Sequence, residues 1–384
     1  MNKRCIPILL LTGLVSFSAL ADLTINGFAS IKAGMTTKSD RTLYGYDDKI
    51  DFKNESLIAL QIRSDLGDKL SVTAQLLGRG QEDFDVGFEW AFISYQLSDN
   101  MTINAGRLRT PFYKYSDFKD VGYAYDWLRV PQGVYGLGFD NIEGISFYRT
   151  AQLGGMESSL QLVAGGYSGT TSFSGTEVNA TIDSIAGITW ELSAQALSMR
   201  LAYLTGKTSI DVSPIVLAPG FNVGNLFTTL DSVGVSALRR DIDIVNESAQ
   251  FLGGGLTYDD GDWIAVTELT QVKVNNSFIA TQRNYYLSVG KRFNSFTPYI
   301  SFEREDNKSK NEIYQPYASA LPPALFQPVV GLVTSQARKA DTMNLGLRYD
   351  FHPSAAFKLQ YSSEDNKRLN RQSDLIALGI DLVF

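Results

Sequence analysis

Apolar and polar residues alternate in short segments along nearly the whole chain. Between residues 56 and 64, for example, Ile58, Leu60 and Ile62 are separated by small or polar residues. Side chains of a β-strand point to opposite faces in turn, so this pattern predicts strands with one apolar and one polar face. Sixteen strands are predicted, at about residues 23–35, 56–64, 69–79, 87–97, 100–108, 141–150, 156–166, 179–190, 194–206, 248–258, 262–273, 283–292, 296–305, 340–350, 354–364 and 374–384.

The lengths of these segments and of their connections indicate a membrane barrel. Each segment is close to the roughly 9–11 residues that a tilted strand needs to cross a bilayer. Tight connections rich in Gly, Asn, Asp and Ser alternate with long ones at 36–55, 109–140, 207–247 and 306–339. Short turns at one end and long loops at the other are typical of outer-membrane barrels. The predicted fold is therefore all-β: a transmembrane antiparallel β-barrel with about 16 strands and long extracellular loops. A soluble barrel or sandwich would need polar residues on its outer face.

The C-terminal segment 374–384 has the most apolar row of all. Ile376, Leu378 and Ile380 share one face, and the chain ends on Phe384. A soluble edge strand of this kind would favour aggregation, whereas a strand that closes a barrel in lipid leaves no open edge. The segment therefore predicts the closing strand. It resembles the last strand of bacterial outer-membrane proteins, and this resemblance implies recognition by the barrel assembly machinery through Phe384.

The first 21 residues have the pattern of a secretory signal peptide. Lys3 and Arg4 precede an apolar run over 6–15, and an Ala-Leu-Ala triplet ends at Ala21. The apolar run is too short to span a membrane as a helix. We predict cleavage after Ala21, so that residues 1–21 are the signal peptide and 22–384 form one barrel domain.

Composition excludes several functions. The sequence's one cysteine, Cys5, lies in the predicted signal peptide, so the mature chain has no thiol for a disulfide, a nucleophile or a metal. The formal net charge of −7 argues against nucleic acid as a partner. Aromatic residues make up 12% of the chain and many lie near predicted strand ends, as in the aromatic girdles of membrane barrels.

The long connection 109–140 is the main functional candidate. Pro111 ends the preceding strand because proline cannot donate to a sheet. The segment combines acidic and basic residues with many tyrosines and tryptophans. It is too long to be a plain turn and too aromatic to be disordered. The aromatic residues have two interpretations: platforms on which sugars stack, or packing that anchors the loop to the barrel wall.

Three motifs resemble those of Gram-negative porins, in particular a gammaproteobacterial branch. They are GRLRTPF at 106–112 followed by YKYSD at 113–117, INGF at 25–28, and the terminal Phe384. The resemblance implies a sixteen-stranded homotrimer in outer-membrane lipid and lipopolysaccharide, without a cofactor. It also implies that the third loop, 109–140, folds inward and narrows the channel, with acidic residues on the loop facing basic residues on the wall.

Carried over residue by residue, the resemblance places several charged residues at the constriction. The candidates are Arg63, Arg79, Arg107, Arg109, Asp117, Asp120, Asp126 and Arg129. The Pro-Glu-Phe-Gly-Gly loop signature of enterobacterial general porins is absent, which leaves open which loop acid lines the constriction. Arg107 has the parity of the lipid-facing Ile103 and Ala105, so either a bulge near Gly106 resets the alternation or Arg107 lies at the strand end.

The predicted function is passive diffusion of small hydrophilic solutes and ions through a water-filled channel; the alternative is a substrate-selective channel for anions or sugars. No enzyme is predicted, because the one histidine, His352, lies in a predicted periplasmic turn, away from any lumenal nucleophile. No catalytic or metal site is expected. A plugged or adhesive barrel would tend to have fewer strands. In the long loops, 225–240 and 316–338 are predicted to form short helices that pack together over the mouth.

Overall fold

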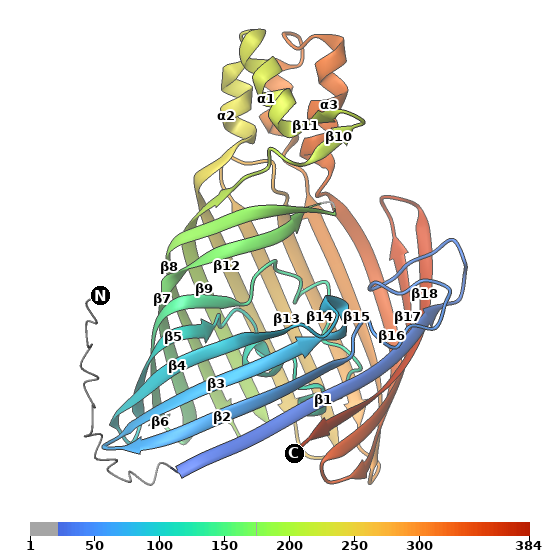
Figure 1. The fold of residues 1–384 in the computed structure, drawn as a ribbon. Helices are drawn as coiled ribbons and strands as arrows, with labels where there is room; N and C mark the ends of the chain where they lie inside the picture. Colours follow the sequence, from blue (N-terminus) through green and yellow to red (C-terminus); the bar gives the residue numbers. More distant parts are fainter. Residues whose placement is uncertain (1–21, 174) are drawn as a thin grey trace, which may run out of the picture.

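The computed structural model describes residues 22–173 and 175–384, so the predicted signal peptide, Cys5 and the cleavage site lie outside the described residues. The described chain forms a closed barrel of sixteen antiparallel strands, as predicted (Figure 1). The strands are β1 (Asp22–Thr36), β2 (Leu57–Gly67), β3 (Leu70–Arg79), β4 (Val86–Ser98), β5 (Met101–Arg109), β6 (Asn141–Leu153), β7 (Met156–Phe173), β8 (Thr176–Ala194), β9 (Leu197–Ile210), β12 (Ile244–Asp259), β13 (Trp263–Val274), β14 (Thr281–Lys291), β15 (Phe296–Lys308), β16 (Arg338–His352), β17 (Ala355–Asn366) and β18 (Arg371–Val383).

The two terminal strands close the barrel. β1 pairs with β18 in a register that places Lys32 opposite Gly379. Beyond β18, the Phe384 amide donates to the Gly27 carbonyl at 2.9 Å, and the Gly27 amide donates to the Phe384 carbonyl at 2.7 Å. The C-terminal segment therefore closes the sheet, as its apolar row predicts.

Side chains of the strands alternate between the membrane-facing surface and the interior. On β18, Ile376 and Leu378 are exposed on the outer face, whereas Ala377 and Asp381 are buried inside. The same alternation exposes Ile58, Leu60 and Ile62 of β2. An apolar outer face suits lipid, and the polar inner face leaves the interior to charged and hydrogen-bonding groups.

The connections differ in length between the two ends of the barrel. At the end that carries Asp22 and Phe384, the connections are turns of a few residues, such as 99–100 and 195–196. At the other end, the long connections are 37–56, 110–140, 211–243 and 309–337. A shorter connection at this end contains the 3-10 helix η1 (Gly80–Glu82).

The structure corrects the sequence-based prediction at one hairpin. β7 and β8 are 18 and 19 residues long, much longer than the predicted segments 156–166 and 179–190, and only residues 174–175 join them. The added length is rich in Ser, Thr and Gly. This added part of the hairpin contains few apolar residues. It therefore lacks the alternation of apolar and polar residues from which the strands were predicted.

The loops 211–243 and 309–337 form a small cap above the barrel (Figure 1). The cap contains the hairpin β10 (Val216–Ala218) and β11 (Phe221–Asn222), the helices α1 (Val223–Ser232), α2 (Ser236–Ile242) and α3 (Pro323–Thr334), and the 3-10 helices η4 (Asn311–Ile313) and η5 (Gln315–Tyr317). The Asn222 side chain caps α1 by accepting from the Asn225 amide at 2.8 Å.

Both loops contribute to one apolar core in the cap. Leu226 and Leu230 of α1 pack in a single cluster with Val329 and Leu332 of α3. This confirms the prediction that the two loops form short helices and pack together over the mouth. None of the helices in residues 22–173 and 175–384 is long and apolar enough to cross a membrane.

Candidate functional site

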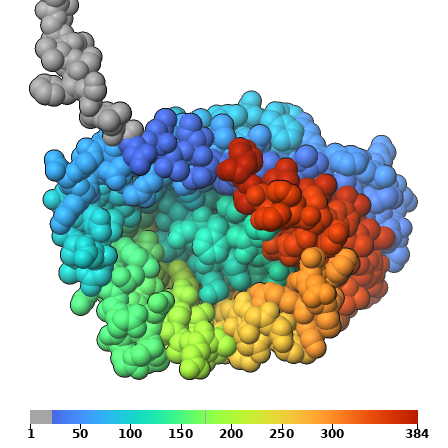
Figure 2. All heavy atoms as spheres, turned by 90° about the horizontal axis from the view of Figure 1, so that it is seen from below, coloured from blue at the N-terminus to red at the C-terminus, as the bar shows by residue number. Residues whose placement is uncertain are grey.

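The third loop, residues 110–140, folds into the barrel and occupies much of its interior (Figure 2, seen from the end with the short turns). The Thr110 amide donates to the Asp140 carbonyl at 2.7 Å, which holds the two ends of the loop together. Between them lie the 3-10 helices η2 (Ser116–Phe118) and η3 (Gly122–Ala124). The indole N–H of Trp127 reaches Ser288 of β14 at 2.7 Å, so the loop spans the lumen from β5 to the opposite wall.

On one side, the loop packs against the wall through its aromatic rings. The rings of Tyr113, Tyr115 and Trp127 are buried in one cluster with Leu204 and Phe251 of the wall. Tyr125 and Tyr135 belong to the same cluster. Of the two interpretations of these aromatic residues, the structure agrees with packing that anchors the loop. Aromatic pairs in such clusters add to the stabilisation that comes from burial of their area.

On the other side, ionic contacts attach the loop to the wall at Asp120. Its carboxylate oxygen Oδ2 lies 2.6 Å from Nη2 of Arg109 and 3.2 Å from Nη2 of Arg79. Glu89 of β4 also pairs with both arginines: its carboxylate oxygens lie 2.8 Å from Nη1 of Arg109 and 3.0 Å from Nη2 of Arg79. Burial alone would raise the pKa of Asp120, but the two guanidinium groups hold it below its ordinary value.

A bulge in β4 brings Glu89 into this cluster. The pairing of β3 with β4 shifts register between Gln75 and Leu76, which leaves Glu89 without a partner on β3. The bulge turns the carboxylate toward Arg79 and Arg109 and away from the apolar outer face. Sequence alternation alone gives Glu89 the parity of the exposed Ile93, so it did not identify this residue.

The contact of Arg129 reverses the predicted arrangement of charges. Here the basic residue is on the third loop, and its acidic partner is on the first long loop, 37–56. Its guanidinium makes two hydrogen bonds to Glu55, at 2.8 and 2.7 Å, and stacks over the Tyr44 ring at 4.8 Å. Burial favours the neutral form of Glu55, yet Arg129 holds the pKa of Glu55 below its ordinary value. A bidentate pair of this kind fixes the position of the loop.

A buried lysine holds the middle of the loop. Lys358 of β17 donates to the carbonyls of Gly122, Tyr125 and Trp127 at 2.6, 2.6 and 2.7 Å, and its ammonium lies 2.9 Å from Asp381. The alternation of β17 predicts that Lys358 faces the interior, but nothing in the sequence indicates that it binds main-chain carbonyls of the third loop.

The remaining predicted site residues are not part of one cluster. Asp126 lies 3.7 Å from Arg348 of β16, whose guanidinium also donates to the Tyr123 carbonyl at 2.9 Å. Asp117 and Arg63 are exposed. Arg63 is near the short-turn end of β2, whereas Arg79 is at the opposite end of β3, where it pairs with Leu57. The structure thus brings together Arg79, Arg109 and Asp120 and leaves Arg63 apart.

Arg107 lies apart from the cluster around Asp120. Its guanidinium donates to Glu143 of β6 at 2.7 Å, and both side chains are partly exposed. The pairing of β5 with its neighbours shows no register shift at Gly106, so the proposed bulge there is wrong. Arg107 keeps the parity of Ile103 and Ala105 near the end of its strand.

Two polar cavities border the loop. One, of about 370 Å³, is lined by the cations Lys32, Arg79, Lys119 and Arg129, by the acids Glu55 and Asp120, and by neutral residues. The other, of about 480 Å³, is lined by Lys114, Arg292 and Arg348, by Asp126, Asp259 and Asp350, and by neutral residues. Tyr125 lines both cavities. Within the described part of the chain, no group of three or more His, Cys, Asp or Glu side chains is arranged to hold a metal ion.

Comparison with known proteins agrees with this architecture. The DcaP channel of Acinetobacter baumannii has a TM-score of 0.59 at 11% identity, with 95% of this chain and 97% of that chain covered. An anion-selective porin from Comamonas acidovorans has a TM-score of 0.57 at 14% identity, with 95% and 100% covered. OmpT of Vibrio cholerae has a TM-score of 0.58 at 10% identity, with 94% and 97% covered. At these identities the likeness shows the fold.

The family is shown by the sequence itself. No curated protein matches it significantly, but residues 9–381 match the Gram-negative porin family. This match covers nearly the whole chain and agrees with the closed sixteen-stranded barrel, the short turns at one end and the inward-folded third loop. The chain therefore belongs to the Gram-negative porin family, whose members are outer-membrane channels for the diffusion of solutes.

Proposed function

We propose that small hydrophilic solutes and ions cross this channel beside the charged face of the third loop and that anions are favoured. The observation that carries the proposal is the composition of the 370 Å³ cavity, in which four cationic side chains face two carboxylates. The second cavity has equal numbers of acidic and basic side chains, so the first determines the sign of the selectivity. Charged groups that line a narrow aqueous passage lower the electrostatic energy of ions of opposite charge and raise that of ions of like charge, which makes the passage selective.

Contact between the charges determines how strongly each one acts. Asp120 and Glu55 form ion pairs with Arg109 and Arg129 at hydrogen-bond distance, and Lys119 pairs with Asp140, so these paired charges contribute little net field to the passage. Lys32 lines the same cavity and adds a positive charge that these two acids do not neutralise at hydrogen-bond distance. One solved structure that resembles this barrel is the anion-selective porin from Comamonas acidovorans. Its selectivity agrees in sign with the one proposed for this chain.

We extend the proposal to assembly and location. The chain is exported by a signal peptide at 1–21 that is cleaved after Ala21, and residues 22–384 form one barrel domain with 109–140 as its constriction loop. The assembly machinery recognises Phe384, and the barrel works as a homotrimer in lipid and lipopolysaccharide. One form of OmpT from Vibrio cholerae with this fold is a trimer (TM-score 0.54, 10% identity). Molar-mass measurement of the purified protein tests the trimer, and its N-terminal sequence tests the cleavage site.

The proposal includes no catalysis. His352 ends β16 in a short turn, where its Nδ1 accepts from the Ser354 amide at 3.1 Å. The charged cluster around Asp120 includes Arg79, Arg109 and Glu89, whereas the hydrogen bond of His352 is to Ser354 and not to this cluster. A Ser–His hydrolase needs its histidine at hydrogen-bond distance from the nucleophile. We therefore assign transport, and not hydrolysis, to the lumen.

Reversal potential in a planar bilayer tests the proposal. The purified protein is inserted between unequal KCl solutions, and the voltage at zero current gives the ratio of chloride to potassium permeability. We expect a ratio above one and ohmic conductance that rises with salt. A ratio below one contradicts the anion preference. The absence of channels from folded protein contradicts the open passage.

A further inference from the structure

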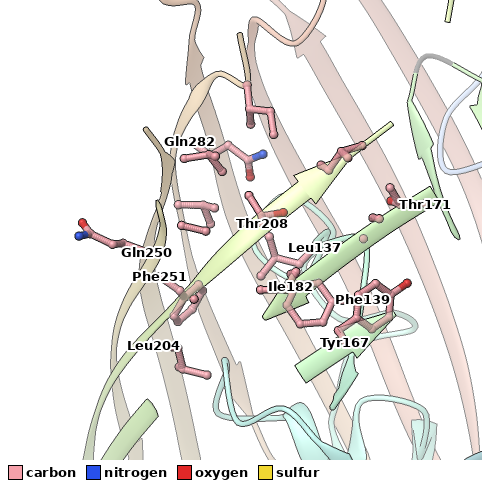
Figure 3. Close-up of a pocket in the computed structure, with 18 of the residues that line it drawn as sticks. Leu137, Phe139, Tyr167, Thr171, Ile182, Leu204, Thr208, Gln250, Phe251 and Gln282 are labelled. Carbon is pink, nitrogen blue, oxygen red and sulfur yellow. The ribbon is translucent and has the colours of Figure 1, made fainter. Parts of the chain in front are cut away.

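A third cavity differs from the two polar ones in its chemistry. It has a volume of about 250 Å³ and lies between residues 136–139 of the third loop and the wall formed by β7–β9 and β12–β14. Among the residues that the structure describes, no charged side chain lines it. Its surface is made largely by apolar groups, and Figure 3 shows the rings of Phe139, Tyr167 and Phe251 with Ile182 and Leu204 around it.

This cavity separates the two large apolar cores of the molecule. Below it, Leu204 and Phe251 belong to the cluster that anchors the third loop. Above it, Val274 and Ile279 belong to the core of the cap. The loop edge is open to solvent, because Gly136 and Gly138 are exposed. An apolar hollow that is open to water at one edge exposes a hydrophobic surface, and such surfaces commonly mark ligand sites.

A few uncharged polar groups border the hollow. Gln282 of β14 reaches it from the wall (Figure 3). Thr171 and Thr208 add hydroxyl groups. The amide can donate to one group and accept from another. A ligand with a single neutral polar substituent would therefore satisfy Gln282 and bury its apolar part against the rings.

We propose that this cavity is a binding site for uncharged amphipathic molecules of one or two rings that carry a hydroxyl or carbonyl group. Charged solutes are disfavoured, because the lining has no charge that could offset their desolvation. Sugars are disfavoured as well, because their many hydroxyl groups exceed the few polar groups in the lining. The site thus takes a class of solute different from the hydrophilic ions of the charged cavities. It lies on the opposite face of the third loop from the 370 Å³ cavity.

Crystals of the full mature protein soaked with 4-bromobenzyl alcohol test the site, since the anomalous scattering of bromine locates the probe. We expect a bromine peak among Ile182, Leu204 and Phe251. Bromine found only on the lipid-facing surface overturns the proposal. A detergent or lipid chain in the cavity that the probe does not displace also overturns it, because the site would then belong to acyl chains.

Binding measured in lipid nanodiscs gives a solution test. The variant Ile182→Trp fills the cavity and is expected to weaken binding of the probe at least about tenfold. The matched control is Ile188→Trp on the same strand, whose side chain is exposed on the outer face, and it is expected to bind as the parent does. Equal binding by the two variants contradicts the proposal.

A second variant keeps the test valid if Ile182→Trp does not fold. Gln282→Leu leaves the cavity open and removes the side-chain amide that borders it. We expect the parent protein to prefer 4-bromobenzyl alcohol to 4-bromotoluene and the variant to lose this preference by several-fold. An unchanged preference contradicts the assigned role of Gln282. These binding measurements do not depend on ion selectivity. They can therefore contradict the proposed site while the proposed anion preference holds, and the reversal potential can contradict the anion preference while the site holds.

Discussion

The two faces of the third loop differ in the share of apolar packing that holds them. Toward β3, β5 and β16–β18 the contacts are ionic or hydrogen-bonded, as at Asp120 and Lys358. Toward β7–β9 and β12–β14 the loop packs through buried rings and aliphatic side chains, together with polar contacts such as those of Arg200 with the Pro111 and Phe112 carbonyls. The loop therefore divides the interior into a charged part, next to the 370 Å³ cavity, and an apolar part, next to the 250 Å³ cavity. One loop can thus position an ion path and a hydrophobic site independently.

The largest effect is expected from Lys358→Met on the charged face. The change leaves Asp381 buried without its cation and frees three loop carbonyls. Breaking a buried ion pair by removing one partner costs about 3–5 kcal/mol. We expect a lower unfolding temperature and a change in single-channel conductance of several-fold. Lys367→Met, an exposed residue near Asp365, is the control, and an equal response of the two variants would argue against the role of Lys358.

A comparable loss of stability without a change in selectivity is expected from Ile142→Ala on the apolar face. Ile142 is fully buried in the aromatic cluster, and truncation of such a residue costs about 2–5 kcal/mol. The measurements are unfolding in denaturant and the reversal potential. Ile145→Ala, exposed on the outer face of the same strand, should change neither. A shift in the reversal potential for Ile142→Ala would show that the two faces are coupled.

A smaller effect is expected from Asp120→Asn, which removes one carboxylate from the charged cavity. The reversal potential should shift toward anions, and the lost charge-assisted hydrogen bonds should cost about 1–3 kcal/mol. Asp117→Asn, at an exposed neighbouring carboxylate, should leave the unfolding temperature unchanged. A shift toward cations in Asp120→Asn would contradict the account.

The same residue predicts a pH dependence. The pKa of Asp120 is lowered in the folded protein, so its stabilising contribution is present above the ordinary carboxyl pKa of about 3.9 and is lost as pH falls through the lower folded value. If the contacts of Asp120 with Arg79 and Arg109 determine the conductance, it should therefore stay constant from neutral pH to about pH 4. A conductance change near pH 6 that Asp120→Asn abolishes would show that the carboxylate is not held in its charged form.

The smallest effect is expected from Arg107→Gln. The pair with Glu143 is partly exposed, and exposed pairs contribute about 0–1 kcal/mol. Stability and the reversal potential should both stay within error of the parent. A large change in selectivity would place Arg107 in the ion path.

Alternation predicted the sixteen strands because lipid on one face and a polar interior on the other act on every residue in turn. It failed at the ends of β7 and β8, where Ser, Thr and Gly replace the apolar residues. The alternation of β17 predicts that Lys358 faces inward. It could not predict the partners of Lys358, since this residue is more than 200 residues from the carbonyls that it binds. The resemblance to porins supplied the inward loop and its acids, but not the contact of Asp120 with two arginines.

Cysteine accessibility tests the division of the interior most directly, because the sequence's one native cysteine, Cys5, precedes the predicted mature chain. Gln81→Cys places a thiol in the charged cavity, and Thr171→Cys places one in the apolar cavity. A charged methanethiosulfonate reagent is added while current is recorded. The account predicts a stepwise fall in current for Gln81→Cys and no change for Thr171→Cys. A fall in current for Thr171→Cys alone would contradict it, because ions would then pass on the apolar face of the third loop.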